Sequence, residues 1–360
     1  MELAARAPGR QIRVLIVDDS AFMRRAIERL ITTRPGIVVV GTASNGLEGV
    51  QKALELRPDV ITMDVEMPRL DGVSAVAEIM KTVPTPVIML STTTTQGAET
   101  TIRALEAGAV DCVAKPSAQS TDLPNVGEVL WAAVLRASDI RMRHIRPTLR
   151  PVPTQPPGPV PTPRHSGLPS RNLVVIGSST GGPPALTEVV PHLPADLSAG
   201  VIVVQHMPAG FTAALARRLD TLSPLTVREA VEGDTIAAGT VLVAPGDRHV
   251  VVSANRTVHL STAPSVHGVR PAVDITLDSV AKVYGRNLTV AILTGMGRDG
   301  AAGAALAEQA GAHVIIQDEA TSVVWGMPRV TKELTQRPQE LPIERIAPAI
   351  ARAVTQHVTG

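Results

Sequence analysis

The chain has very few aromatic residues: two phenylalanines, one tyrosine and two tryptophans among 360 residues. Its cores must therefore be built mainly from Val, Ile, Leu and Ala, the mixture expected of parallel strands with helices over both faces. A single cysteine, Cys112, excludes an internal disulfide and is consistent with a reducing compartment. No apolar run approaches the ~18 residues of a membrane-spanning helix, and no signal-like apolar segment opens the chain. We therefore expect a soluble, cytoplasmic protein with no membrane insertion.

An excess of charge of either sign is also missing. Lysine and arginine number 34 and acidic residues 33, for a net charge of +1. This balance gives no electrostatic attraction to nucleic acid or to an anionic membrane surface. No basic helix-turn-helix pattern occurs in the second half of the chain either. We therefore expect no nucleic-acid partner.

Proline, by contrast, is concentrated in one segment. Nine of the 23 residues from Pro147 to Pro169 are proline, which predicts an extended, semi-rigid spacer. Short apolar strands alternate with helical patterns on both sides of this spacer. That alternation predicts two α/β domains with largely parallel sheets. We predict an N-terminal domain over residues 11–138, a proline-rich linker over 139–170 and a C-terminal domain over 171–358.

In the first domain, charged and hydroxyl side chains follow four apolar strands. They are Asp18, Asp19, Asp64, Ser91 and Lys115. Because parallel strands bring their carboxyl ends to one edge of a sheet, these groups should meet in one pocket. Clustered carboxylates favour a hard cation such as Mg²⁺, and Asp64 beside such an ion and Lys115 suits a phosphoryl acceptor. Any single aspartate could instead be a helix cap, but four agreeing strand ends favour a site.

These residues lie in motifs that resemble the response-regulator receiver domain: Val-Asp-Asp-Ser, Met-Asp-Val-Glu-Met-Pro, Leu-Ser and Lys-Pro, over about residues 11–135. The resemblance implies a (βα)5, flavodoxin-like doubly wound parallel sheet. It also implies that a partner histidine kinase phosphorylates Asp64. Asp18, Asp19 and Asp64 would hold Mg²⁺, while Ser91 and Lys115 would sense and contact the phosphoryl group. Cys112 stands where many receivers carry an aromatic switch residue, and we expect it to be a small core residue.

In the second domain, three strands end in residues suited to nucleophilic acyl chemistry. The segment Gly177-Ser-Ser-Thr-Gly181 presents Ser179 in a tight turn, and two later strands run into His206 and Asp299. Convergence of these strand ends predicts a Ser-His-Asp site in which His206 deprotonates Ser179 and Asp299 orients the imidazole. Backbone amides around Thr180 or Met296 would form the oxyanion hole. The order Ser, His, Asp differs from that of α/β-hydrolases.

The segment that contains Asp299 also fits a dinucleotide-binding fingerprint. Gly295, Gly297 and Gly300 follow an apolar strand and open a helix, and Asp318 closes the next strand. This interpretation places Asp299 against a pyrophosphate and leaves Ser179 and His206 without a role. A C-terminal half that only binds a nucleotide or a partner nevertheless remains the alternative hypothesis.

Six segments of the second domain resemble the chemotaxis methylesterase (CheB) family: Gly177–Gly182, Gln205–Phe211, Ala244–Asp247, Arg270–Asp274, Leu293–Gly300 and Trp325–Pro328. The resemblance implies a three-layer α/β/α domain with a mainly parallel sheet and Ser179, His206 and Asp299 as catalytic residues, lined by Thr180 and Met296. The implied substrates are glutamate γ-methyl esters and certain glutamines of methyl-accepting chemotaxis receptors. Demethylation and deamidation of these receptors serve adaptation in chemotaxis, and no cofactor is expected at the hydrolase site.

The resemblance also implies regulation of the hydrolase by the receiver. The unphosphorylated receiver would cover the hydrolase site, and phosphorylation of Asp64 would loosen that docking. One position beside the site departs from the family pattern, because Arg298 replaces the more common Asn before Asp299. We expect this change to tune the activity without abolishing it.

Overall fold

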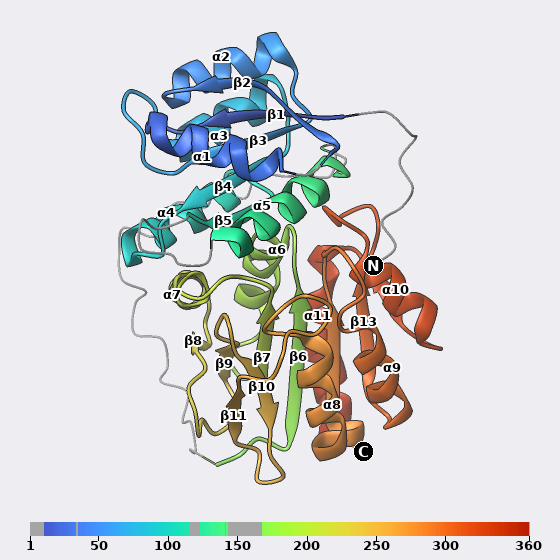
Figure 1. The fold of residues 1–360 in the computed structure, drawn as a ribbon. Helices are drawn as coiled ribbons and strands as arrows, with labels where there is room; N and C mark the ends of the chain where they lie inside the picture. The colour runs from blue at the N-terminus through green and yellow to red at the C-terminus, as the bar shows by residue number, and fades with distance from the viewer. Residues whose placement is uncertain (1–10, 34, 116–122, 141, 143–167, 360) are drawn as a thin grey trace. The chain divides into compact units, whose positions relative to one another are not determined.

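The computed structural model describes residues 11–33, 35–115, 123–140, 142 and 168–359 (Figure 1). The chain divides into two compact units, residues 1–149 and residues 150–360. Most of the predicted linker 139–170, as well as Pro116 of the Lys-Pro motif, lies outside the described residues. The bounds of the three predicted segments therefore stay a prediction.

The N-terminal unit is a five-stranded parallel sheet in the order β2-β1-β3-β4-β5. Its strands are β1 (Ile12–Val17), β2 (Ile37–Ala43), β3 (Val60–Asp64), β4 (Val87–Ser91) and β5 (Asp111–Ala114). Its helices are α1 (Ala21–Ile31), α2 (Gly46–Leu56), α3 (Gly72–Thr82), α4 (Thr95–Glu106) and α5 (Leu123–Ser138). Helix α1 packs on α5, and α2, α3 and α4 pack in series. This is the (βα)5, doubly wound fold predicted from the sequence.

Polar residues fix where these helices begin. The side chains of Ser20, Asn45, Asp71 and Thr94 each accept the N–H three residues further on, at the starts of α1 to α4. Each such cap contributes on the order of 1 kcal/mol. Strands β3 and β4 are buried along their whole length, whereas the edge strand β2 is mostly half-buried. The caps thus fix the loops that join the ends of the strands to the helices that follow them, and these loops carry the site residues.

The C-terminal unit contains a seven-stranded parallel sheet in the order β14-β13-β12-β6-β7-β9-β8. Its strands are β6 (Asn172–Ser178), β7 (Ala199–Gln205), β8 (Thr226–Glu229), β9 (Thr240–Val243), β12 (Leu288–Ile292), β13 (His313–Gln317) and β14 (Gln339–Leu341). Strands β10 (His249–Val252) and β11 (Val258–Ser261) form a separate antiparallel pair. The α-helices are α6 (Gly182–Val189), α7 (Phe211–Leu222), α8 (Val273–Tyr284), α9 (Ala301–Gln309), α10 (Met327–Leu334) and α11 (Ile343–Thr359).

Helices cover both faces of this sheet, as the three-layer prediction required. Helices α8 and α9 pack together on one face with α10 beside α9, and α6, α7 and α11 lie on the other (Figure 1). Strand β6 lies at the centre, between β12 and β7. All seven of its residues are buried. The site residues that follow β6, β7 and β12 are therefore carried by three adjacent strands.

Four strands of this unit are not recognised, or not correctly placed, from apolar runs alone. The apolar run Val250–Ser253 has the pattern of a strand of the main sheet, but it corresponds to β10, which pairs only with β11 within the described part of the chain. Strands β8, β11 and β14 are three or four residues long and carry few buried side chains. Such short edge segments lack the apolar run by which the other strands are recognised.

Among the described residues, no helix has both the length and the apolar character needed to cross a membrane.

Candidate active site

His206 and Asp299, 93 residues apart in the sequence, are in direct contact. His206 follows β7, Asp299 follows β12, and the His206 Nε2 and Asp299 Oδ2 atoms are 2.7 Å apart. Both side chains are largely buried, with exposed fractions of 9% and 2%. A carboxylate at this distance fixes the orientation of the imidazole and stabilises its protonated form. The ring's other nitrogen, Nδ1, is left to act on a neighbouring group.

The Asp299 carboxylate is fixed by backbone donors at the start of α8. Oδ2 accepts the N–H of Val273 at 2.6 Å, and Oδ1 accepts the N–H groups of Asp274 and Gly300 at 3.0 Å each. Burial raises the pKa of Asp299, but His206 and the backbone donors outweigh burial, so its pKa lies below the ordinary value. The carboxylate is therefore ionised and held by four hydrogen bonds, one of them with His206.

Ser179 lies in the turn between β6 and α6, beside the loop that follows β12. Its N–H donates to the Thr294 carbonyl at 3.0 Å, and a Cβ added to Gly295 would come within 2.9 Å of the Ser179 Cβ. The Ser179 hydroxyl has no hydrogen-bond partner among the described residues, His206 included. Catalytic hydrogen bonds are often long in the absence of substrate and tighten when it binds.

Thr180 and Met296 lie on the two loops that meet at this serine. Thr180 is buried and its carbonyl accepts the Thr294 hydroxyl at 3.0 Å, whereas Met296 is half-buried. Neither backbone N–H donates a hydrogen bond within the part of the chain that the structure describes. Two unpaired amides beside a serine are suited to bind a developing oxyanion.

Two residues that the sequence analysis did not single out hold these loops together. Gln205, the last residue of β7, donates to the carbonyls of Ser179 and His206 at 2.9 and 3.0 Å and accepts the Ser178 hydroxyl at 2.6 Å. The Thr294 hydroxyl accepts the Val324 N–H at 3.0 Å. Both were detectable as polar residues that directly follow apolar runs of the sequence, a position where a buried side chain needs partners.

In the N-terminal unit the predicted carboxylates and lysine do meet. Lys115 Nζ lies 2.8 Å from Asp18 Oδ2 and 2.6 Å from Asp64 Oδ2. Burial, the largest effect, raises the pKa of Asp64 despite Lys115. Burial lowers the pKa of Lys115, but its two aspartate partners outweigh this, and the net shift is upward. Asp64 is thus a partly desolvated carboxylate beside a permanent cation.

The three aspartates fit a divalent cation. Asp18, Asp19 and Asp64 each offer an oxygen within 4.8 Å of the others. Apart from the Lys115 ammonium, the buried Asp18 Oδ2 has no hydrogen-bond partner in the described residues, so it has lone pairs to offer. Oxygen ligands of this kind suit Mg²⁺.

Ser91 and Cys112 are both buried, and neither side chain is hydrogen-bonded to the side chains of Lys115 or the three aspartates in the described structure. The Ser91 hydroxyl lies 3.1 Å from the Gly97 carbonyl and 3.2 Å from that of Thr92, and it makes no contact with Asp64 in the described structure. Contact with a phosphoryl group would require its hydroxyl to rotate. Cys112 is a core residue, as expected, and burial raises the pKa of its thiol well above the ordinary value.

Comparison with known proteins agrees with this division of the chain. Residues 14–124 match the model of the response regulator receiver domain, and residues 174–350 match that of the CheB methylesterase. A protein-glutamate methylesterase/protein-glutamine glutaminase from Symbiobacterium thermophilum is 51% identical over 353 residues, which cover 96% of this chain and 98% of the relative. The chain belongs to the CheB methylesterase family. As a member of that family it is a hydrolase joined to a receiver domain.

Relatives of the same name occur in distant organisms. The protein-glutamate methylesterase/protein-glutamine glutaminase from Pyrococcus abyssi is 42% identical, with 96% of this chain and 94% of the relative covered. One from Pseudomonas aeruginosa is 43% identical, with 97% and 99% covered. The receiver and hydrolase units are thus joined in the same order in these CheB relatives.

Proposed function

We propose that this chain hydrolyses glutamate γ-methyl esters and deamidates glutamines of methyl-accepting chemotaxis receptors, using Ser179, His206 and Asp299. The main support is the contact of His206 with an ionised, fully anchored Asp299 on strands adjacent to the one that carries Ser179. The names of the relatives supply the glutamate and glutamine substrates. The chemotaxis function of the family supplies the receptors, and the reaction would take place in the cytoplasm.

The reaction proceeds through an ester of Ser179. The imidazole of His206 takes the hydroxyl proton as the Ser179 oxygen attacks the γ-carbonyl carbon, and the imidazolium then gives that proton to the leaving methoxide or amide nitrogen. Methanol or ammonia leaves, and a glutamyl-serine ester remains. Water attacks this ester with His206 again as base, which releases the glutamate carboxylate and restores the Ser179 hydroxyl. The N–H groups of Thr180 and Met296 stabilise the oxyanion in both steps.

Phosphorylation of Asp64 by a histidine kinase would control this activity. Asp18, Asp19 and Asp64 would hold Mg²⁺, which when bound offsets the negative charge of the phosphoryl group. Lys115, now paired with Asp18 and Asp64, would shift onto a phosphoryl oxygen, and Ser91 would rotate towards it. Movement of these two side chains would couple the phosphoryl group to α4 and β5. Added Mg²⁺ should raise the melting temperature of the receiver unit, and an Asp18→Asn variant should lose that response.

The alternative dinucleotide-binding function has less support. Asp318, the acidic residue of that fingerprint, accepts the Thr321 N–H at 3.0 Å and its hydroxyl at 2.6 Å, both through Oδ1, so one of its two carboxylate oxygens is already engaged. The Asp299 charge would also oppose a pyrophosphate at this turn.

A serine-directed fluorophosphonate probe tests the nucleophile. Peptide mass spectrometry should find the label on Ser179 in the wild type and no label in Ser179→Ala. The neighbouring Ser178→Ala variant should still be labelled, since the Ser178 hydroxyl is buried and donates to Gln205. Absence of any label, together with tight NAD binding, would support the alternative instead.

A further inference from the structure

The helices α8 and α9 cap one another through two aspartates. Neither helix has a side-chain cap of its own, since Ala272 and Gly300 occupy the cap positions. Asp299, just before α9, accepts the N–H groups of Val273 and Asp274 at the start of α8. In return the Asp274 Oδ1 accepts the N–H of Gly303 in the first turn of α9 at 2.7 Å. The position of Asp299 therefore depends on where Asp274 is held.

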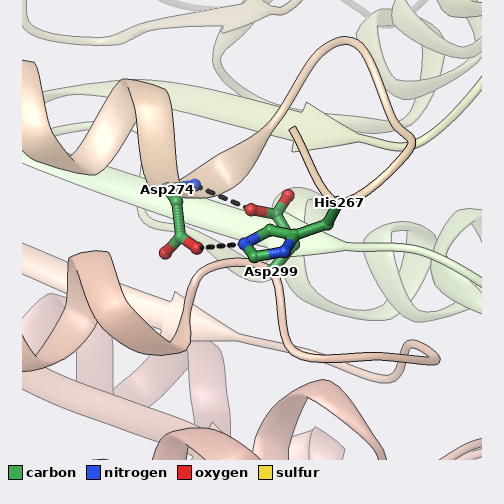
Figure 2. A group of neighbouring side chains, drawn as sticks. All are labelled: His267, Asp274 and Asp299. Atoms are coloured by element: carbon green, nitrogen blue, oxygen red, sulfur yellow. Dashed lines mark hydrogen bonds and ion pairs between the residues drawn. The ribbon is translucent and has the colours of Figure 1, made fainter. Parts of the chain in front are cut away.

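His267 is the residue that holds the other oxygen of Asp274. Its Nε2 lies 2.9 Å from Asp274 Oδ2, and Figure 2 shows the imidazole facing this carboxylate while Asp299 faces the backbone nitrogen of Asp274. Asp274 is thus joined to α9 through one oxygen and to the loop before α8 through the other. A chain of contacts runs from His267 through Asp274 and Asp299 to His206.

The backbone at His267 lies in the left-handed region. His267 has a φ of +55° and Gly268 one of +78°, in a tight turn closed by two hydrogen bonds between Val266 and Val269 of 3.1 and 3.0 Å. Such turns favour Asn and Gly, and a larger side chain with positive φ carries strain that the surroundings must offset. The contact with Asp274 is the interaction that the imidazole gains in this conformation.

The charges around Asp274 also call for a donor at this point. Burial, the largest effect, and the nearby negative charge of Asp299 raise the pKa of Asp274, while His267 and the Gly303 N–H lower it. His267 therefore helps to keep Asp274 ionised beside a second carboxylate. Although His267, Asp274 and Asp299 could together face a metal ion, both oxygens of each carboxylate already accept hydrogen bonds. The two carboxylates therefore have hydrogen-bond partners on every oxygen without a metal ion.

We propose that His267 is a positioning residue for the hydrolase: by anchoring Asp274, it fixes the start of α8, whose N–H groups hold Asp299 against His206. This inference rests on the proposed role of Asp299 as the carboxylate that orients His206. It adds to the site a residue 61 positions from His206 in the sequence, which acts through Asp274 and Asp299.

The test compares four variants of the full chain with the wild type, measuring methanol release from methylated receptor fragments with a phosphodonor present. His267→Asn keeps a residue that favours the turn but is too short to reach Asp274. His267→Gln keeps a longer side chain with an N–H donor. Asp299→Asn calibrates the loss of the central carboxylate. His259→Ala is the matched control, because His259 forms a comparably close pair with Glu232, 2.7 Å apart, on the exposed side of β11.

We expect His267→Asn to lower kcat roughly tenfold with KM within about twofold of the wild type, because the reacting groups are misplaced while the substrate surface is intact. His267→Gln should recover most of the loss, and His259→Ala should show none. Wild-type kcat in His267→Asn, alongside a strong loss in Asp299→Asn, would overturn this inference alone. Full activity in Asp299→Asn would overturn the proposed catalytic residues and this inference with them. A loss in His267→Asn matched by a lower melting temperature and not recovered by Gln would indicate a structural role only.

Discussion

Carboxylates of this chain differ in pKa because their surroundings differ. Backbone N–H groups and His206 outweigh burial at Asp299 and lower its pKa, whereas burial dominates at Asp64 and Asp274 and raises theirs. Asp299 therefore gains stability from ionisation in the folded state, whereas the charges of Asp64 and Asp274 cost stability.

The amide variant Asp299→Asn should fold but lose nearly all esterase activity. Asn presents an NH₂ group either to His206 or to the N–H groups of Val273 and Asp274, and neither arrangement holds the imidazole as the carboxylate does. We expect kcat to fall by roughly 10³- to 10⁴-fold, the scale found when a triad carboxylate becomes an amide. Steady-state kinetics and circular dichroism on the same sample measure both effects. A loss below tenfold in a folded variant would contradict the role of Asp299.

Removal of the Asp64 charge should stabilise the receiver unit at neutral pH. The pKa of Asp64 is raised above 3.8 in the folded state, so the ionised form is disfavoured by folding at pH 7. This penalty shrinks as the pH falls through the folded pKa and is lost below the unfolded pKa, where both states are protonated. Asp64→Asn should therefore melt a few degrees higher than the wild type at pH 7 and about equally near pH 3.5.

Asp71→Asn is the control for this measurement, because Asn caps a helix about as well as the Asp71 that now caps α3. It should leave the melting temperature nearly unchanged at both pH values. A stabilisation of Asp64→Asn that does not depend on pH would show that the Asp64 charge is not its cause.

Among the elements, the strand-to-helix turns set the geometry of both sites. Gly182 begins α6, and a Cβ there would lie 1.9 Å from Gln205 Oε1, the atom that accepts the Ser178 hydroxyl. Position 182 therefore tolerates no side chain without displacing Gln205, which also binds the carbonyls of Ser179 and His206.

A Gly182→Ala variant should accordingly lose both stability and activity. We expect about 1–3 kcal/mol of destabilisation, the usual cost of overpacking a buried contact. The esterase activity should fall further than this loss of stability explains, since Ser179 and His206 both shift. Urea unfolding and kinetics at low denaturant separate the two effects. Unchanged kinetics would show that Gln205 does not position these residues.

Much of this architecture could be predicted from the sequence, for identifiable reasons. Fully buried strands such as β6 and β7 appear as uninterrupted apolar runs, and the residue after each run marks the sheet edge where ligands gather. That the residues after β6, β7 and β12 come together depends on these strands being neighbours in the sheet, and local sequence patterns do not contain the strand order. The link from His267 to Asp299 depends on two helix starts that meet only in the folded unit, so spacing along the chain could not indicate it. Short strands such as β14 were missed because their pairing, rather than their composition, defines them.

At the scale of the whole molecule, a receiver unit is joined to a methylesterase unit. The first carries a carboxylate beside a cation, suited to receive a phosphoryl group, and the second a serine beside a histidine-carboxylate pair. We propose that phosphorylation of the first raises the activity of the second. This requires the phosphoryl group to favour one of two states of the chain over the other.

The most direct test measures methanol release from methylated receptor cytoplasmic fragments by the full chain, with and without a small-molecule phosphodonor. We predict that release by the wild type rises with the phosphodonor, that Asp64→Asn stays at the low basal rate in both conditions, and that Ser179→Ala releases no methanol in either. Methanol release by Ser179→Ala at the wild-type rate, or an equal response to the phosphodonor in Asp64→Asn, would contradict the account.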